Sequence, residues 1–347
     1  MLNEETVTLK GSPGINQDLG KNSDNLRYLK KKLFDRALSS ATVDHCPDSD
    51  TKNKVEPLLG DDANNIAHQS SLSTTSDSLI LQDEVLGPLY HQFKSWSSRP
   101  LEKRYPIVFF QHRDVLIHDP SHREGHGSAQ LLCVLGVSDA GKQDVLSILC
   151  ADSIDESLCY QVFQDMRDRG ATHIDICIGD LPTGFAKAAQ SVFPGSDKKL
   201  CLYQLTRRTI AKVVPEDRIK IESMCKRVYQ ATRAEDASTQ LFDTTAKWEA
   251  MGYREIREEW MFYHNGILAY FEYQLFLKKF IVGYNIFSAL NHRVINPIRS
   301  GKEFISKEAL LSLVLLGFLV PPRAWKESVR HWPPIFSEIQ DFRNTRD

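Results

Sequence analysis

The sequence predicts an α/β protein in which a mixed sheet is flanked by helices. Two observations support this fold class. Between Tyr105 and Thr206, segments with the apolar pattern of strands alternate with segments that have the pattern of helices. After Thr206 the pattern is helical almost to the end of the chain. With 347 residues, of which 41% are hydrophobic, the chain is long enough to bury a substantial core.

Three strands are expected first. Residues 105–119 (YPIVFFQHRDVLIHD) contain a long run of apolar and alternating residues that predicts a strand. Two further strands, SAQLLCVLGVS and KQDVLSILCADS, are joined at residues 139–141 (DAG), a sequence typical of a turn. We therefore expect the three strands to follow one another as a meander.

Helices and strands are then expected to alternate. An amphipathic helix is predicted to end at Gly170, because glycine commonly stops helices. Its apolar face contains Leu158, Val162, Phe163 and Met166. Residues 173–179 (HIDICIG) predict a buried fourth strand, residues 184–193 a second helix, and residues 199–205 (KLCLYQL) a fifth strand. This order predicts a mixed sheet covered by helices.

The chain divides by composition and pattern into four parts. Residues 1–95 are expected to form a mobile region, because Ser, Asn, Asp and Thr dominate most of it and few apolar residues are available for a core. We expect residues 99–214 to form the first part of the α/β core and residues 215–279 to form an all-helical insertion. Residues 280–347 are expected to contribute helices that complete the core.

Two groups of residues in the helical segments have more than one interpretation. A helix is predicted near residues 23–38, and its basic residues form either a contact with DNA phosphates or an ordinary solvated face. The insertion is rich in aromatic residues, which either pack between helices or stack on bases, and we expect packing. These aromatic residues include Phe242, Trp248, Tyr253, Trp260, Phe262 and Tyr263.

The net charge and the cysteine content limit which cellular compartment and which partners are expected. The formal net charge of −2 gives no global signal for nucleic acid, so any affinity for DNA must come from local patches. The seven cysteines form no CxxC pair, which favours buried thiols in a reducing compartment, and we expect a cytoplasmic protein. Residues 309–320 (ALLSLVLLGFLV) are too short to span a bilayer, so they predict a buried helix and no membrane partner.

Three motifs resemble those of the Mutator-type transposases of bacterial insertion sequences. They are RPLEKRYPIVFF at residues 99–110, LGVSDAGKQDVLSIL at residues 135–149 and ICIGDLPTGFAKAAQSVFP at residues 176–194. The segment PPRAWKESVRHWPPIF, at residues 321–336, is also similar. The resemblance implies a ribonuclease H-like fold. It also implies metal-dependent cleavage of a DNA phosphodiester followed by strand transfer.

The resemblance further implies three acidic metal ligands, of which this chain has one. At the family's three positions stand Gln111, Asp180 and Ser288. Two bound Mg²⁺ or Mn²⁺ ions need negative oxygen ligands, and an amide and a hydroxyl supply no such charge. Asp180 is therefore the expected catalytic metal ligand, although outside the family context it would read as a helix cap. Asp114 is expected on the strand face opposite Gln111, which makes it a poor substitute.

Residues around the predicted site are candidates for DNA contact. A basic cluster follows the predicted fifth strand, and polar residues follow Ser288. The cluster either binds DNA phosphates or is an ordinary helix surface of mixed charge. The candidates are Arg207, Arg208, Lys212, Asn291 and Arg293. The family usually carries a histidine where this chain has Gln204, which is a third departure from its pattern.

The sequence therefore predicts a transposase-family protein that is catalytically defective. One alternative is an active transposase that uses atypical ligands together with Mg²⁺ or Mn²⁺. A second alternative is a non-catalytic regulatory partner that binds DNA or an intact transposase. The expected partners are the DNA ends of a transposon and an oligomer of this chain or of an intact relative. A defective protein would need no metal cofactor.

Overall fold

The computed structural model describes residues 23–43, 85–119, 126–180, 183–290, 292–319 and 328–345. The chain divides into two compact units. The larger unit contains Arg99–Arg113, Gln130–Ala289 and Pro321–Asp347. The smaller unit contains Met1–Ser98, Asp114–Ala129 and Leu290–Val320.

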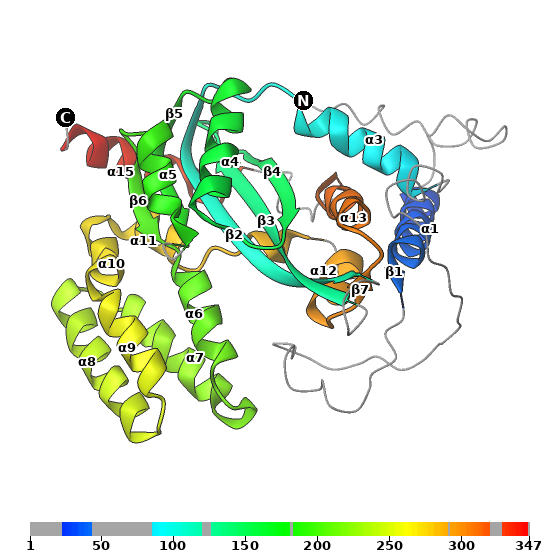
Figure 1. The fold of residues 1–347 in the computed structure, drawn as a ribbon. Helices are drawn as coiled ribbons and strands as arrows, with labels where there is room; N and C mark the ends of the chain where they lie inside the picture. The colour runs from blue at the N-terminus through cyan, green and yellow to red at the C-terminus, as the bar shows by residue number, and fades with distance from the viewer. Residues whose placement is uncertain are drawn as a thin grey trace. The chain divides into compact units, whose positions relative to one another are not determined.

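A mixed sheet flanked by helices forms the larger unit, which confirms the predicted fold class at this level (Figure 1). Its strands are β2 (Arg104–His118), β3 (His126–Val137), β4 (Gln143–Ala151), β5 (His173–Gly179) and β6 (Asp197–Leu200), except that residues 114–118 of β2 and 126–129 of β3 belong to the smaller unit. The predicted meander of β2, β3 and β4 is present, and β3 and β4 pair antiparallel. On the other side of β2, β5 is parallel to β2 and β6 is parallel to β5.

The predicted fifth strand, residues 199–205, is wrong in its second half. Strand β6 ends at Leu200, and helix α6 (Leu202–Ala211) begins two residues later. The Cys201 amide donates to the Gly179 carbonyl at 2.7 Å, and the Leu205 amide donates to the Cys201 carbonyl at 3.0 Å. Cys201 is therefore the point at which the sheet ends and the helix starts. The sequence misleads because apolar residues 200, 202 and 205 fit both periods.

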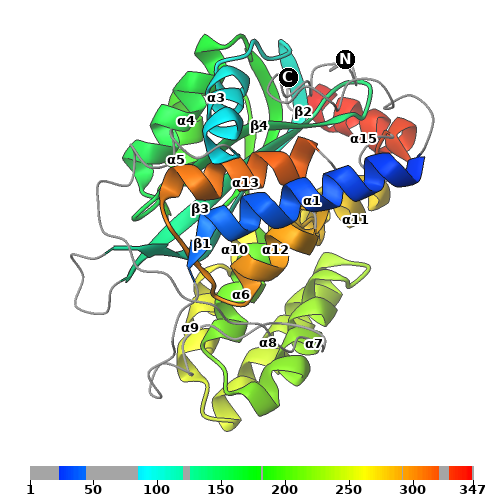
Figure 2. The same cartoon turned by 90° about the vertical axis from the view of Figure 1, so that its right-hand side faces the viewer.

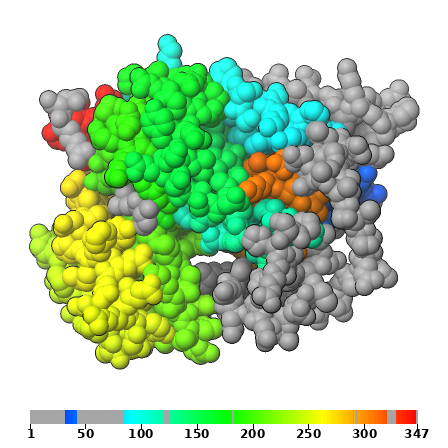
Figure 3. Space-filling model, viewed as in Figure 1, coloured from blue at the N-terminus to red at the C-terminus, as the bar shows by residue number. Residues whose placement is uncertain are grey.

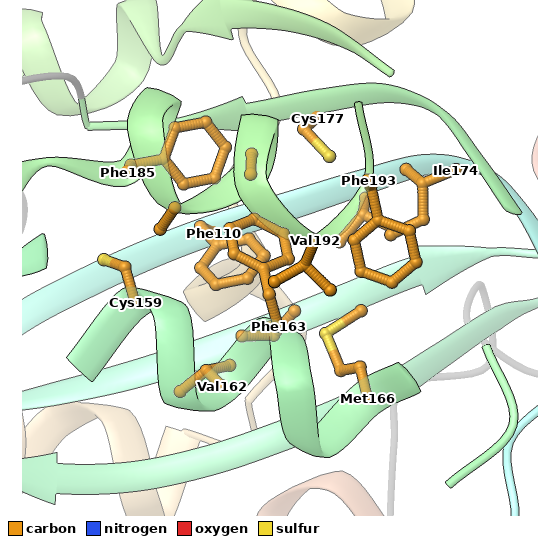
Figure 4. Close-up of a cluster of buried hydrophobic side chains, with 14 of the residues drawn as sticks. Phe110, Cys159, Val162, Phe163, Met166, Ile174, Cys177, Phe185, Val192 and Phe193 are labelled. Atoms are coloured by element: carbon orange, nitrogen blue, oxygen red, sulfur yellow. The ribbon is translucent and has the colours of Figure 1, made fainter. Parts of the chain in front are cut away.

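Helices α4 (Glu156–Asp168) and α5 (Phe185–Val192) pack together on the sheet and bury an aromatic cluster (Figure 4). The ring centroid of Phe110 lies 4.4 Å from that of Phe163 and 5.1 Å from that of Phe185. A Cβ atom at Gly179 would lie 2.6 Å from the Phe185 ring, so the close approach of α5 to the end of β5 requires glycine there. This packing fixes the backbone immediately before Asp180.

The insertion is helical, as its sequence predicts. It consists of α7 (Pro215–Tyr229), α8 (Ala234–Ala250), α9 (Arg254–Phe262), α10 (His264–Leu268), the 3-10 helix Ala269–Glu272 and α11 (Leu275–Val282). Trp248 and Trp260 are fully buried with ring centroids 5.2 Å apart, and Trp260 Nε1 donates to Thr209 Oγ1 of α6 at 2.7 Å. Packing is thus confirmed for these two residues, whereas Phe242 and Phe262 are exposed.

The last helix of the larger unit is α15 (Trp332–Asn344), which packs against α11. The Glu338 carboxylate of α15 accepts the Leu277 amide at 2.6 Å and the Phe276 amide at 3.2 Å. These amides lie in the first turn of α11, where they lack partners within the helix. The positive end of the α11 helix dipole also stabilises the negative charge of a carboxylate at this position.

The smaller unit is mainly helical, and Figure 2 shows its helices α1 and α13 side by side. It contains α1 (Ser23–Ala41), β1 (Thr42–Val43), α3 (Leu86–Ser97), α12 (His292–Arg299), β7 (Glu303–Phe304) and α13 (Lys307–Leu319). Strand β7 pairs antiparallel with β1 and parallel with residues 116–117 of β2.

Two predicted helices of the smaller unit are confirmed, and one helix is unexpected. Helix α1 covers the predicted residues 23–38, and the buried helix α13 covers residues 309–319 of the predicted range 309–320. The sequence did not indicate α3, which buries Leu89 and Phe93. None of the helices in the described ranges is long and apolar enough to cross a membrane.

Candidate active site

The sheet brings Gln111 and Asp180 to equivalent positions on adjacent strands. Strands β2 and β5 run parallel with Phe109 opposite Ile178, and Gln111 and Asp180 each follow two residues later. Both side chains are buried, at 0% and 5% exposure respectively. The two sequence-predicted positions therefore lie at the same end of the sheet in the larger unit.

The amide of Gln111 is committed to the backbone of residues 284–286. Its Nε2 donates to the Tyr284 carbonyl at 2.5 Å, and its Oε1 accepts the Ile286 amide at 2.7 Å. Nε2 also lies 3.5 Å from Cys201 Sγ. Burial raises the pKa of this thiol to about 11, so Cys201 is protonated at neutral pH. Gln111 thus acts as a clamp on the segment that leads to Ser288.

The carboxylate of Asp180 is paired with a guanidinium group from the same chain. Arg208 Nη1 of α6 donates to Asp180 Oδ1, and Arg208 Nε donates to Glu259 Oε1 of α9 at 2.9 Å. Burial lowers the pKa of Arg208, but the two carboxylates raise it more, so it lies above its ordinary value. Arg208 therefore carries a permanent positive charge between Asp180 and Glu259.

A lysine at the C-terminal cap of α6 extends this ion-pair network. Lys212 Nζ lies 3.2 Å from Glu259 Oε2 and 2.6 Å from Glu255 Oε1. Because Arg208 and the cap residue Lys212 are four residues apart, their side chains lie on the same side, and both bind α9. The network joins the insertion to the strand end that carries Asp180.

The predicted DNA-contact residues have different positions. Arg208 and Lys212 are engaged in the ion pairs described above, and Arg207 Nη1 donates to the His112 carbonyl at 3.4 Å. Asn291 lies outside the described residues, and Arg293 belongs to α12 of the smaller unit. The sequence identified a basic cluster but not the acidic partners that two of its members bind.

His112 and Glu259 are site residues that the sequence analysis missed. His112 Nε2 lies 3.9 Å from Asp180 Oδ2, and Gln204 Nε2 lies 3.0 Å from both His112 Nδ1 and the His112 carbonyl. Gln204, which stands where the family usually has a histidine, therefore orients the His112 ring. The sequence did contain a signal for His112, because it stands next to Gln111 and these two polar residues directly follow an apolar strand run.

Ser288 is exposed and lies in a short 3-10 helix, Ile286–Ala289. The next α-helix, α12, begins only at His292, so Ser288 is not part of it. Asn285 starts the short turn by accepting the Phe287 amide on its side-chain oxygen at 3.0 Å. The Ser288 hydroxyl donates to the Asn285 carbonyl at 2.7 Å, within the same turn.

These residues do not fit a two-metal centre. The described residues contain no group of three or more His, Cys, Asp or Glu side chains arranged to hold a metal ion. Asp180 Oδ1 is bound by Arg208, and Gln111 Oε1 is bound by the Ile286 amide. Divalent ions of this class need several free oxygen ligands that converge from separate elements.

Comparison with known proteins places these features in a family. Residues 69–328 match the sequence model described as Transposase, Mutator family. The chain is 26% identical over 237 residues to the transposase for insertion sequence element ISRM3 of Rhizobium meliloti (strain 1021), covering 68% of this chain and 58% of that protein. It is 22% identical over 295 residues to the transposase for insertion sequence element IS1201 of Lactobacillus helveticus, covering 84% and 72%. This chain belongs to the Mutator family of transposases.

Proposed function

We propose that this protein binds DNA as a transposase-family protein but has lost strand cleavage and strand transfer. The observation that carries the proposal is the ion pair between Asp180 and Arg208, since Asp180 is the one acidic residue at the three family positions. The strand order of the larger unit, with β5 and β6 parallel to β2 and a meander beside it, supports a ribonuclease H-like core.

Electrostatics favour the guanidinium over a divalent ion at Asp180. The charge of Arg208 is already adjacent to the carboxylate, and it is fixed there by Glu259. A dication about 4 Å from this guanidinium would be repelled by roughly 8 kcal/mol at an effective dielectric constant of about 20. Gln111 and Ser288 supply no compensating negative charge. Arg208 thus neutralises Asp180 in the place of a metal ion.

The proposed partners are DNA at the ends of an insertion sequence and other copies of the family fold. A chain that binds DNA without cleaving it would act by occupying transposon ends or by assembling with an intact transposase. We also propose a cytoplasmic location. The six described cysteines are free thiols, which is typical of reducing compartments.

Supercoiled plasmid tests the proposal, because a single nick converts it to the relaxed form. We expect wild type and Asp180→Ala to leave plasmid equally intact in Mg²⁺ and in Mn²⁺, while wild type retards the same DNA on a native gel. Metal-dependent nicking by wild type that disappears in Asp180→Ala would show that the chain is an active enzyme. No retardation at low salt would contradict the proposed DNA binding.

A further inference from the structure

The helical insertion contains a groove between α7 and α8. It has a volume of about 430 Å³, within the usual range for ligand sites of roughly 300–1,000 Å³. Its polar lining residues are Arg227, Gln230, Gln240, Asp243, Thr244 and Lys247. The helices α8 and α9 of this insertion form part of the surface in Figure 3, below the sheet-bearing part of the larger unit.

The side chains of the two basic residues that line the groove form no ion pair within the described part of the chain. Arg227 and Lys247 are exposed, and the side chain of neither forms a hydrogen bond or an ion pair with any residue that the structure describes. Neighbouring basic residues outside the groove differ: Lys226 lies 2.5 Å from Glu222, and Arg233 lies 3.2 Å from Asp236. The two groove cations are therefore available for a ligand.

A third cation lies directly behind the groove. Lys278 of α11 is 7% exposed, and its Nζ donates to the carbonyl of Ala231, which lines the groove, at 2.8 Å. Nζ also lies 3.9 Å from the centroid of the Phe271 ring. No carboxylate in the described part of the chain lies within ion-pair distance of Lys278. The pKa of Lys278 is lowered, mainly by its burial and to a lesser extent by the positive charge of Lys279. A buried cation of this kind is stabilised by an anion nearby.

The groove also offers an amide with an unused polar atom. Gln240 Oε1 is buried and has no hydrogen-bond partner among the described residues. Rotation of the terminal amide would present its NH₂ donors at the same point. Asp243 is the acidic residue of the lining, so the basic side chains of the groove and its floor outnumber it.

We propose that this groove binds a phosphate group of a DNA backbone through Arg227, Lys247 and the Gln240 amide. The inference rests on the proposed DNA binding and assigns it a site on the insertion, away from Asp180. An arginine fork and a lysine ammonium suit phosphate oxygens, because both make charge-assisted hydrogen bonds to them. Lys278 contributes positive potential from behind the groove.

Binding of a short labelled DNA duplex, measured by fluorescence anisotropy at several salt concentrations, tests the site. We expect Arg227→Gln and Lys247→Gln each to weaken binding roughly tenfold at low salt. Each should reduce the slope of log K against log salt by about 0.9, the value for one lost phosphate contact. Lys220→Gln is the matched control, because Lys220 is an exposed cation of α7 that does not line the groove. Wild-type affinity and slope in both groove variants would overturn the proposal.

Two further measurements separate this proposal from the proposed function. Gln240→Glu keeps the shape of the side chain and adds a negative charge, so we expect it to weaken DNA binding more than Lys220→Gln does. If wild type binds no duplex at all, the proposed DNA binding fails, and inorganic pyrophosphate then tests the groove alone. A rise in Tm with pyrophosphate that is absent in Arg227→Gln would identify a site for free phosphates. Equal responses of wild type and Arg227→Gln would overturn the groove assignment.

Discussion

Replacing Arg208 by glutamine is expected to lower the free energy of unfolding by about 3 kcal/mol. The change leaves the Asp180 carboxylate, which is 5% exposed, without its guanidinium partner. Removing one partner of a buried ion pair costs more than the pair itself contributes, because the remaining charge stays desolvated. Urea unfolding followed by circular dichroism measures the difference.

Two variants control for this result. Lys212→Gln removes the cation at the C-terminal cap of the same helix, but the Lys212 side chain is 34% exposed, so we expect a loss below about 1 kcal/mol. In Asp180→Asn with Arg208→Gln, both charges are absent, and this double variant should be more stable than Arg208→Gln alone. An Arg208→Gln protein as stable as wild type would show that the ion pair does not hold the site together.

Restoring carboxylates at the two substituted positions is expected to destabilise the protein without restoring cleavage. In Gln111→Asp with Ser288→Glu, the shorter acidic side chain loses the hydrogen bond to the Tyr284 carbonyl and leaves a charge in a fully buried position. An unsatisfied buried group costs about 1–3 kcal/mol, and a charge costs more, so we expect a total loss of about 4 kcal/mol. Arg208 would still neutralise Asp180 in this variant.

Gln111→Met separates the effect of the hydrogen bonds from that of charge. Methionine has a similar length and no charge, so it should lose less stability than Gln111→Asp under the same urea titration. Plasmid nicking in Mn²⁺ measures the second half of the expectation. A stable, nicking-competent double variant would mean that the clamp formed by Gln111 is dispensable and that two substitutions alone removed the activity.

The sequence correctly predicted those elements whose apolar residues repeat with the period of a strand or with that of a helix, but not with both. The buried strand β5 has the predicted bounds, and α4 and α5 lie where the apolar face and the glycine stop indicate. The residues around Cys201 were assigned wrongly because the apolar positions at the end of β6 and the start of α6 fit either a strand or a helix. A local pattern does not resolve a junction of this kind.

The sequence predicted only those residues of the site that lie within a local motif. Asp180 was found because it ends a buried strand within a recognisable segment, but its partner Arg208 stood out only as one member of a basic cluster. Glu259 became a site residue through the packing of α9 against α6, which no pattern along the chain records. The clamp formed by Gln111 likewise depends on backbone groups at residues 284 and 286, which are distant in sequence.

Mn²⁺ binding followed by electron paramagnetic resonance tests the central claim most directly, because bound Mn²⁺ loses the signal of the free ion. The claim is that Arg208 binds the carboxylate of Asp180 in the place of a metal ion. We expect wild type and Asp180→Asn to leave the same amount of free Mn²⁺ at every protein concentration. Stoichiometric uptake of Mn²⁺ by wild type that is lost in Asp180→Asn would contradict the claim.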